Sequence, residues 1–495
     1  MFNWGELMYL CPEPKTLELK KGMLSFPVGE MPAARKKKTP TLFQKESYRI
    51  IIDENGILIE GADDAGLYYG ELTLRQIALN YRGCLPYLYL YDEPEFSYRG
   101  FMIDSCRHFF SVEEIKRMID GAALFKFNKF HFHLSDDQGF RVEIEKYPLL
   151  TSVGSVRPSS DFGRGESDKT EYGGYYTKAQ LRELVEYCRE RHIEIIPEFD
   201  IPGHSTSVIA AYPELSCRGE KIEPKTTAGI FDDILCGGNP EVYELVKGVI
   251  DELCEIFTGE YFHIGGDEAP KKRWRECPKC KAKLRELGLH SMDELQGYMV
   301  NCFSDYLKKK GKKVICWNEA IRGGNVNHDN VTVALWMEKT DNTAQWANAG
   351  NPVIAENFTP YYVDYPYGMH PLKSVYSFNP RRQKGFNSLG KASVKGVESP
   401  IWTEYVRDFS RLSYQCFPRW LAVAETGWSG EEGKSYQRFL RNVEFYCDIL
   451  KGMGLAPAPR SDWDALPHSR LEQTAGFFKN TLTKKAIKQF LHIEE

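Results

Sequence analysis

The stretch YFHIGGDE, from Tyr261 to Glu268, decides how the rest of the chain is interpreted. Tyr261 to Ile264 predicts a short buried strand. The next two residues are glycines, which allow a sharp turn because they have no Cβ. The strand would therefore present Asp267 and Glu268 at its C-terminal end. Two neighbouring carboxylates in a pocket raise at least one pKa, which provides an acid and an anion at one pH. A strand that ends in a solvated acidic turn is the alternative.

The chain around this stretch repeats one unit from Arg99 to about Ser429, namely a short apolar strand, a polar loop and an amphipathic helix. Strands are predicted at 100–105, 129–134, 194–198, 261–264, 313–316, 332–336, 352–355 and 396–401. Helices are predicted between them, for example at 111–125, 177–191, 240–257 and 292–310. This alternation predicts an α/β fold, a (β/α)8 TIM barrel with some irregular crossovers. A doubly wound open sheet is the alternative, but no G-x-G-x-x-G follows a strand.

Three domains are expected. Residues 1–94 combine short alternating runs with a helix near 66–79, which predicts a small α+β domain. Residues 95–430 would form the catalytic barrel, and residues 431–495 a helical C-terminal extension. Residues 151–176 form a long loop rich in Ser, Gly and Asp, and loops of this length are often functional, so we expect it to wall the pocket.

Polar and aromatic residues recur directly after the predicted strands, where a barrel places its active site. In chain order they are Asp104, Asp136 and Asp137, Asp200 and His204, Asp267 and Glu268, Trp317, Trp336, Tyr362 and Asp364, and Trp402 and Glu404. Aromatic faces stack on sugar rings, and charged groups bind hydroxyls, so this set predicts a carbohydrate pocket.

Composition excludes several classes of protein. The 495 residues carry 64 basic and 69 acidic side chains, a net charge of -5, which gives no electrostatic case for binding nucleic acid or an anionic membrane. No targeting segment is visible, and no apolar run approaches the ~20 residues of a membrane helix. The 13 cysteines are scattered over the chain, which favours a reducing, cytoplasmic location.

Cys277 and Cys280 have the C-x-x-C spacing of half a zinc site. No second C-x-x-C and no C-x-x-H accompanies them, so a thiol pair or a surface disulfide is the preferred interpretation and a structural metal the alternative.

Several motifs together resemble glycoside hydrolase family 20, the β-N-acetylhexosaminidases. The resemblance covers about residues 60–430 and includes His263 to Glu268. The other matching motifs are Arg99-Gly100 with Asp104 and Arg107-His108, His133 to Gly139, Pro197 to His204, and Trp402 to Glu404. Phe140 stands where the family commonly has Trp. The last sixty or so residues match no family feature.

The resemblance implies retaining hydrolysis in which the 2-acetamido group of the substrate is the nucleophile, an exception among retaining glycosidases. Glu268 would be the general acid and base, and Asp267 would hold the acetamido nitrogen. Sugar-binding roles are implied for Arg99, Trp317, Trp336, Tyr362, Asp364, Trp402 and Glu404. Asp136 and His204 would support Glu268 from behind, although Asp137 is nearly as good a candidate as Asp136. A structural ion pair is the alternative for Arg99.

The expected partner is a carbohydrate with a terminal N-acetylhexosamine, and the chemistry requires no metal or other cofactor. A non-catalytic sugar-binding protein and a two-carboxylate β-glycosidase are the alternative functions. The sequence leaves the gluco or galacto preference, the natural aglycone and the oligomeric state open.

Overall fold

Eight parallel strands form a closed barrel in the computed structural model, which describes residues 8–28, 30–41, 44–81, 83–163, 167–337 and 341–481. Around the barrel the order is β14-β15-β16-β17-β18-β19-β6-β7. In chain order the strands are β6 (Tyr98–Asp104), β7 (Lys129–His133), β14 (Glu194–Glu198), β15 (Tyr261–His263), β16 (Lys313–Trp317), β17 (Val331–Leu335), β18 (Val353–Ala355) and β19 (Val394–Ile401). Each predicted strand is present, with its ends displaced by no more than two residues.

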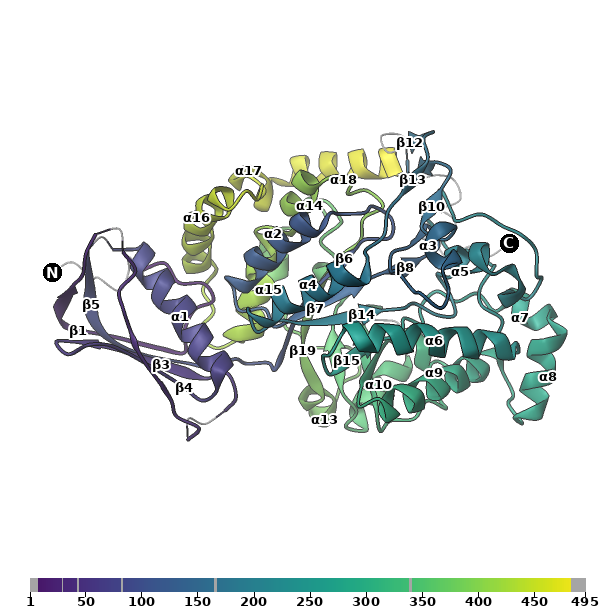
Figure 1. Cartoon of the computed structure of the whole chain (residues 1–495). Coiled ribbons are helices and arrows are strands. Elements are labelled where there is room, and N and C mark those ends of the chain that lie inside the picture. Colours follow the sequence, from purple (N-terminus) through teal and green to yellow (C-terminus); the bar gives the residue numbers. More distant parts are fainter. Residues whose placement is uncertain are drawn as a thin grey trace.

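Helices connect these strands and cover the outside of the barrel (Figure 1). The main ones are α2 (Val112–Ala123), α4 (Lys178–Arg189), α6 (Pro240–Ile256), α9 (Met292–Lys309), α10 (Asp341–Asn348) and α15 (Arg419–Trp428). Helix α2 begins at a capping box between Ser111 and Glu114, which satisfies backbone N–H groups at the helix start. The crossover from β16 to β17 carries only the short η3 (Asn318–Ile321), so the expected irregularity lies there.

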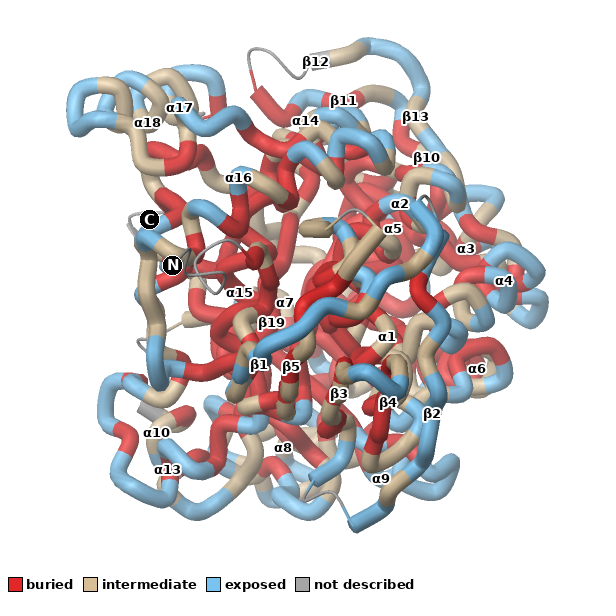
Figure 2. Tube along the Cα trace, turned by 90° about the vertical axis from the view of Figure 1, so that its left-hand side faces the viewer, coloured by how far each residue is buried: buried red, intermediate tan, exposed pale blue. Residues whose placement is uncertain are grey.

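A five-stranded sheet with one helix forms the N-terminal domain, at the opposite side of the molecule from α7 and α8 in Figure 1. Its strand order is β1 (Thr16–Ser25), β5 (Cys84–Asp92), β3 (Tyr48–Asp53), β4 (Gly56–Gly61) and β2 (Arg35–Lys38). Helix α1 (Asp64–Leu79) packs on this sheet, and the core includes Trp428 from α15 of the barrel. The lysine-rich β2 is an exposed edge strand (Figure 2), and lysines on an edge discourage pairing with other chains.

Helices follow the barrel and share its apolar core. Helix α16 (Tyr436–Gly452) contributes Phe439, Val443 and Leu450 to the same apolar cluster as the barrel. The chain then forms α17 (Arg460–Trp463) and α18 (Pro467–Thr481), and residues 482–495 of the predicted extension lie outside the described part.

The long loop 151–176 is more ordered than its composition suggests, since it contains two short antiparallel ladders. One joins β10 (Val156–Arg157) to β13 (Tyr172–Gly173), and the other joins β11 (Ser160–Asp161) to β12 (Ser167–Asp168). Among the described residues, no helix combines the length and apolarity that a membrane crossing requires.

All thirteen cysteines are free thiols in the structure. The expectation of a surface disulfide at Cys277 and Cys280 is therefore wrong, and the alternative of two thiols agrees with the structure. Both are buried, and both lie beside Cys217 and Cys236, which come from a different loop.

Candidate active site

A cavity of about 200 Å³ lies at the C-terminal ends of the barrel strands. Its lining consists of Arg107, Asp136, Asp200, His204, Asp267, Glu268, Trp336, Phe358, Tyr362, Asp364, Tyr365, Trp402, Glu404 and Tyr405. Nine of the eleven predicted site residues are in this set, and Arg99 and Trp317 are not. None of the described residues of loop 151–176 is in it, and residues 164–166 of this loop lie outside the described part of the chain. Ligand pockets typically measure about 300–1,000 Å³, so this smaller volume suits one monosaccharide unit.

The two glycines before the acidic pair are required by close packing. Gly265 has φ +64°, and a Cβ there would lie 1.7 Å from Oδ1 of Asp200. The Gly266 N–H donates to the same oxygen at 2.9 Å. Glu268 follows with φ +40°, and its N–H donates to Oε2 of Glu319 at 2.6 Å. The turn is therefore held by two buried carboxylates that accept from its backbone.

Asp267 is buried, with 8% of its surface exposed. Burial raises the pKa of its carboxyl well above the ordinary value, and repulsion from Asp200 adds to the effect. Its Oδ1 accepts no hydrogen bond from any group in the described part of the chain. A buried acceptor without a partner is rare, because leaving it unsatisfied costs free energy. Asp267 thus offers a free acceptor to a ligand N–H.

His204 lies between the acidic pair and a second carboxylate. Its Nε2 is 3.6 Å from Oε2 of Glu268 and 3.9 Å from Oδ2 of Asp267, and its Nδ1 is 3.2 Å from Oδ1 of Asp136. Burial alone would lower the pKa of this imidazole, but the carboxylates of Asp136, Asp137 and Glu268 raise it well above its usual range. The surrounding carboxylates therefore favour the protonated imidazole, which lies beside both members of the acidic pair.

The structure distinguishes Asp136 from Asp137. Asp136 lines the cavity, and its Oδ2 is 2.7 Å from Nη2 of Arg107. Burial acts against ionisation of Asp136, but Arg107 and His204 hold its pKa far below the ordinary value. Asp137 instead accepts from the backbone N–H of Thr206 at 2.9 Å, at the start of α5 (Thr206–Ala211).

Three aromatic rings form a wall of the cavity. Trp336 stacks on Tyr362 with centroids 6.1 Å apart, and Tyr362 lies 6.2 Å from Trp402. Trp317, expected in this wall, lies one layer deeper: it is fully buried, 6.0 Å from Trp402, and its indole N–H donates to Glu198 at 2.9 Å. Trp317 therefore supports Trp402 from behind.

Two further carboxyl groups, those of Asp364 and Glu404, line the cavity. Burial raises the pKa of Asp364, and the charge of Glu404 adds to this rise. Burial also raises the pKa of Glu404, although Arg107 opposes the rise. Oδ1 of Asp364 has no hydrogen-bond partner among the described groups, and the same holds for the indole N–H of Trp336. Unsatisfied polar atoms on both the acidic and the aromatic side of the cavity match a ligand rich in hydroxyl and amide groups.

Arg99 does not bind at this cavity, which corrects the sequence prediction. It is the second residue of β6, so it lies at the opposite end of the barrel from the rim. Its guanidinium donates to Glu46 at 2.8 Å, to the carbonyl of Lys126 at 2.8 Å and to the hydroxyl of Tyr69 at 3.2 Å. Arg99 therefore forms a structural ion pair with Glu46, which connects the barrel to the N-terminal domain.

Arg107 occupies the position expected for Arg99. It follows Asp104 just after β6, on the rim, and its guanidinium lies 4.9 Å from the Trp402 ring and 3.8 Å from Glu404. Active-site residues of a barrel follow the C-terminal ends of its strands, and this alone favours Arg107. Arg99 lies near the start of β6 instead. Other cavity residues that the sequence analysis did not name are Phe358, Tyr365 and Tyr405, and Asp200 was expected at the rim without a specific role.

The C-terminal extension packs against two aromatic residues that line the cavity. Phe477 of α18 packs on Tyr365 and Tyr405 with centroids 5.4 and 5.3 Å away. No sequence pattern indicated this contact.

Asp136, Asp137 and His204 lie close enough together to share a metal ion, but their ligand atoms already bond Arg107, Thr206 and one another.

Comparison with known proteins gives consistent results. The model of the glycosyl hydrolase family 20 catalytic domain matches residues 96–431, and that of glycosyl hydrolase family 20, domain 2, matches residues 12–88. A beta-hexosaminidase of Porphyromonas gingivalis is 38% identical over 436 residues, covering 83% of this chain, and the chain spans 54% of that relative's length. A beta-hexosaminidase of Akkermansia muciniphila is 32% identical over 477 residues, covering 91% of this chain and 94% of the relative.

Solved structures agree. An exo beta-N-acetylglucosaminidase from Vibrio harveyi in complex with N-acetylglucosamine superimposes with a TM-score of 0.81 at 27% identity, covering 92% of this chain and 78% of that one. A beta-N-acetylhexosaminidase from Bacteroides fragilis gives 0.79 at 29% identity, covering 93% and 98%. The chain belongs to glycosyl hydrolase family 20.

Proposed function

We propose that this protein is an exo-acting β-N-acetylhexosaminidase that releases terminal β-linked N-acetylglucosamine or N-acetylgalactosamine with retention of configuration. The observation that carries the proposal is the free Oδ1 of Asp267, a buried acceptor beside Glu268. A 2-acetamido group can satisfy this acceptor with its N–H and so hold its own carbonyl oxygen near the anomeric carbon. A plain 2-hydroxyl can also donate to the acceptor, but it carries no such oxygen.

In the first step of the proposed reaction, the acetamido oxygen attacks the anomeric carbon while Glu268 protonates the departing glycosidic oxygen. The C1–O bond to the leaving group breaks, and the sugar becomes an oxazolinium ion. Asp267 accepts the acetamido N–H and offsets the positive charge that develops on the ring, as preorganised charge does. Burial keeps the Tyr362 hydroxyl protonated by raising its pKa, so it can donate to the acetamido oxygen.

In the second step, Glu268 removes a proton from water, which attacks the anomeric carbon and opens the oxazolinium ring. Two inversions at one carbon give net retention. The backbone N–H of Glu268 donates to Glu319, and its carboxylate lies 3.6 Å from the His204 imidazole. These two contacts position Glu268 beside the cavity, where it has to act in both steps.

The remaining side chains suit the non-reacting part of one sugar. Trp336, Tyr362 and Trp402 offer aromatic surface to the ring and methyl group, and Arg107, Asp364 and Glu404 offer charged partners to hydroxyls. The small cavity favours a single terminal sugar unit.

We also propose a reducing location such as the cytoplasm, which the thirteen free thiols support. Cell fractionation tests this proposal.

Three aryl glycosides test the function: N-acetyl-β-glucosaminide, N-acetyl-β-galactosaminide and plain β-glucoside. Turnover of one or both acetamido sugars with no turnover of the glucoside is the expected result. Equal rates on the glucoside, or a covalent glycosyl ester trapped on any side chain, would favour a two-carboxylate mechanism. No turnover of any of them, with binding of N-acetylglucosamine retained, would favour a sugar-binding protein.

A further inference from the structure

Four cysteine sulfurs converge at the side of the barrel farthest from the N-terminal domain. They belong to Cys217, Cys236, Cys277 and Cys280, and all lie within 4.8 Å of one another. The separations are 3.5 Å between Cys236 and Cys280, 3.7 Å between Cys236 and Cys277, and 3.8 Å between Cys217 and Cys280. Three of these side chains are buried and that of Cys217 is half-buried.

This spacing is that of a tetrahedral metal site. With zinc–sulfur bonds of about 2.3 Å, the sulfurs of a tetrahedral tetrathiolate lie about 3.8 Å apart. A disulfide requires sulfurs about 2.05 Å apart and joins them in pairs. Here Cys236 has two sulfur neighbours at similar distances, which fits a shared central ion. We propose that these four cysteines bind one structural zinc ion, a site separate from the catalytic cavity.

The local backbone is built for this convergence. Cys277 occupies the N-cap position of α8 (Pro278–Glu286) and Cys280 lies in its first turn, so both residues are at the positive end of the helix, which favours thiolates. The second pair comes from the loop after β14, where the Cys236 N–H donates to the carbonyl of Leu215 and holds Cys217 and Cys236 together. A Cβ on Gly238 would lie 2.2 Å from the carbonyl carbon of Lys279, so only glycine permits this approach.

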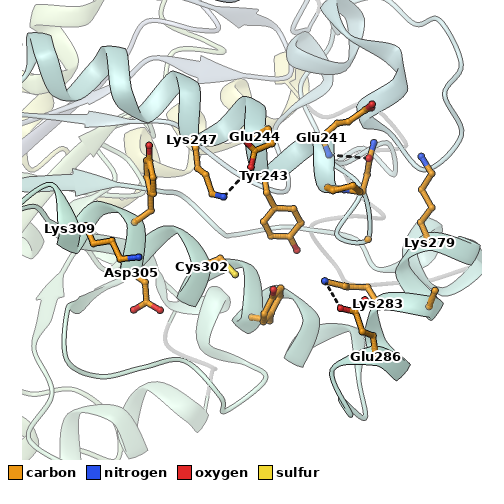
Figure 3. A pocket seen from close by; sticks show the side chains of 16 residues that line it. Glu241, Tyr243, Glu244, Lys247, Lys279, Lys283, Glu286, Cys302, Asp305 and Lys309 are labelled. Carbon is orange, nitrogen blue, oxygen red and sulfur yellow. Dashed lines mark hydrogen bonds and ion pairs between the residues drawn. The ribbon is translucent and has the colours of Figure 1, made fainter.

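The segment that carries Cys277 and Cys280 has little else to hold it. In α7 (Lys272–Glu276) only Trp274 is buried, and in α8 only Cys280 is. On its other side, α8 is separated from α6 and α9 by a groove of about 890 Å³, and Figure 3 shows Lys279, Lys283 and Glu286 of α8 lining it. Small units without an apolar core are commonly stabilised by metals, whose binding energy becomes folding energy.

The choice of zinc follows from the ligands. Four sulfur donors without a carboxylate or imidazole select a soft or borderline cation, and a closed tetrahedral set is typical of structural zinc. The four thiols release their protons when the ion binds. The helices α7 and α8, which flank Cys277, also carry basic residues, including Lys272, Arg275 and Lys281.

The proposed ion would connect two loops of the active site. Cys277 and Cys280 follow Asp267 and Glu268 after β15, while Cys217 and Cys236 follow His204 after β14. The zinc would thus fix the loop of the acid relative to the loop of its imidazole neighbour. This is a positioning role, and the existence of the site does not depend on the proposed hydrolase activity.

Metal analysis of the full-length protein, purified without a metal-affinity tag or chelator, is the direct test. We expect about one zinc ion per chain. Cys236→Ser and Cys280→Ser should lose it and lower the melting temperature. Cys302→Ser, a half-buried cysteine of α9 that lines the neighbouring groove, is the matched control and should keep both. Zinc-free protein, stoichiometric iron in place of zinc, or a disulfide among the four cysteines by mass spectrometry would overturn the assignment.

Because the serine variants can fail to fold, two measurements use the unaltered chain. Titration with a mercurial thiol reagent should release zinc to a colorimetric dye in step with modification of four thiols. Protein exchanged into cobalt should show sulfur-to-cobalt charge transfer and the intense visible bands of a tetrahedral ion. Release of no zinc, or the weak spectrum of octahedral cobalt, would contradict a tetrathiolate site.

Discussion

Asp267→Asn isolates the charge that the proposed mechanism requires. The substitution keeps the size of the side chain but removes its negative charge. A ligand N–H bonded to the free Oδ1 would place the amide nitrogen about 3 Å away, so the centre of the oxazolinium charge lies at about 4 Å. At this separation and an effective dielectric constant of about 20, the attraction is about 4 kcal/mol. That corresponds to about a 10³-fold loss in kcat.

The assay is steady-state hydrolysis of an aryl N-acetyl-β-glucosaminide, with kcat and KM measured separately. KM should change little, because most of the positive charge develops only in the transition state. Thermal unfolding is the control. The raised pKa of Asp267 means that the protein loses stability as pH rises above the ordinary aspartate value, so Asn should leave the melting temperature unchanged or higher at neutral pH. A folded variant that retains kcat within about tenfold of the parent would refute the electrostatic role.

Other substitutions separate the remaining roles. Glu268→Gln should slow natural disaccharides far more than aryl glycosides with acidic leaving groups, because the latter need little protonation; equal losses on both would contradict the acid role. Asp200→Asn keeps the acceptor for Gly266 but removes the repulsion that helps to raise the pKa of Asp267. Since Asp267 must be ionised, the acidic limb of kcat/KM should move to lower pH, and a limb that stays in place would show that another group sets it. Arg107→Lys should raise KM by about tenfold or more, because a lysine ammonium cannot bond both Asp136 and a substrate hydroxyl in the planar geometry of a guanidinium. Arg99→Lys should lower the melting temperature with KM unchanged, and the opposite assignment of effects would reverse our placement of the two arginines.

The barrel was predictable because its signals are local. Each strand is a short apolar run, and the position of Asp267 and Glu268 after one of them follows from the alternation of strand and loop. The prediction for Arg99 is wrong because Arg99 lies at the N-terminal end of β6, whereas Arg107, in the same motif, follows the C-terminal end of this strand. A barrel places its active site at the C-terminal ends of its strands.

Contacts between distant parts of the chain were not predictable. Cys217 and Cys236 have no C-x-x-C spacing of their own, so only the folded loops reveal that they meet Cys277 and Cys280. The same is true of Phe477 behind Tyr405, and of Trp317, whose depth is set by its hydrogen bond to Glu198. Periodicity gives the face of an element, but it does not give the depth of a side chain beneath a surface that several loops build together.

The left-handed backbone at His204 and Glu268 affects how the protein responds to selection for stability. A side chain in that conformation costs on the order of 1 kcal/mol, which glycine does not incur. At these two positions, therefore, glycine would favour thermal stability while catalysis requires His204 and Glu268. A library selected only for survival at high temperature should accumulate glycine there and yield stable proteins without activity, so such a selection has to be coupled to product formation.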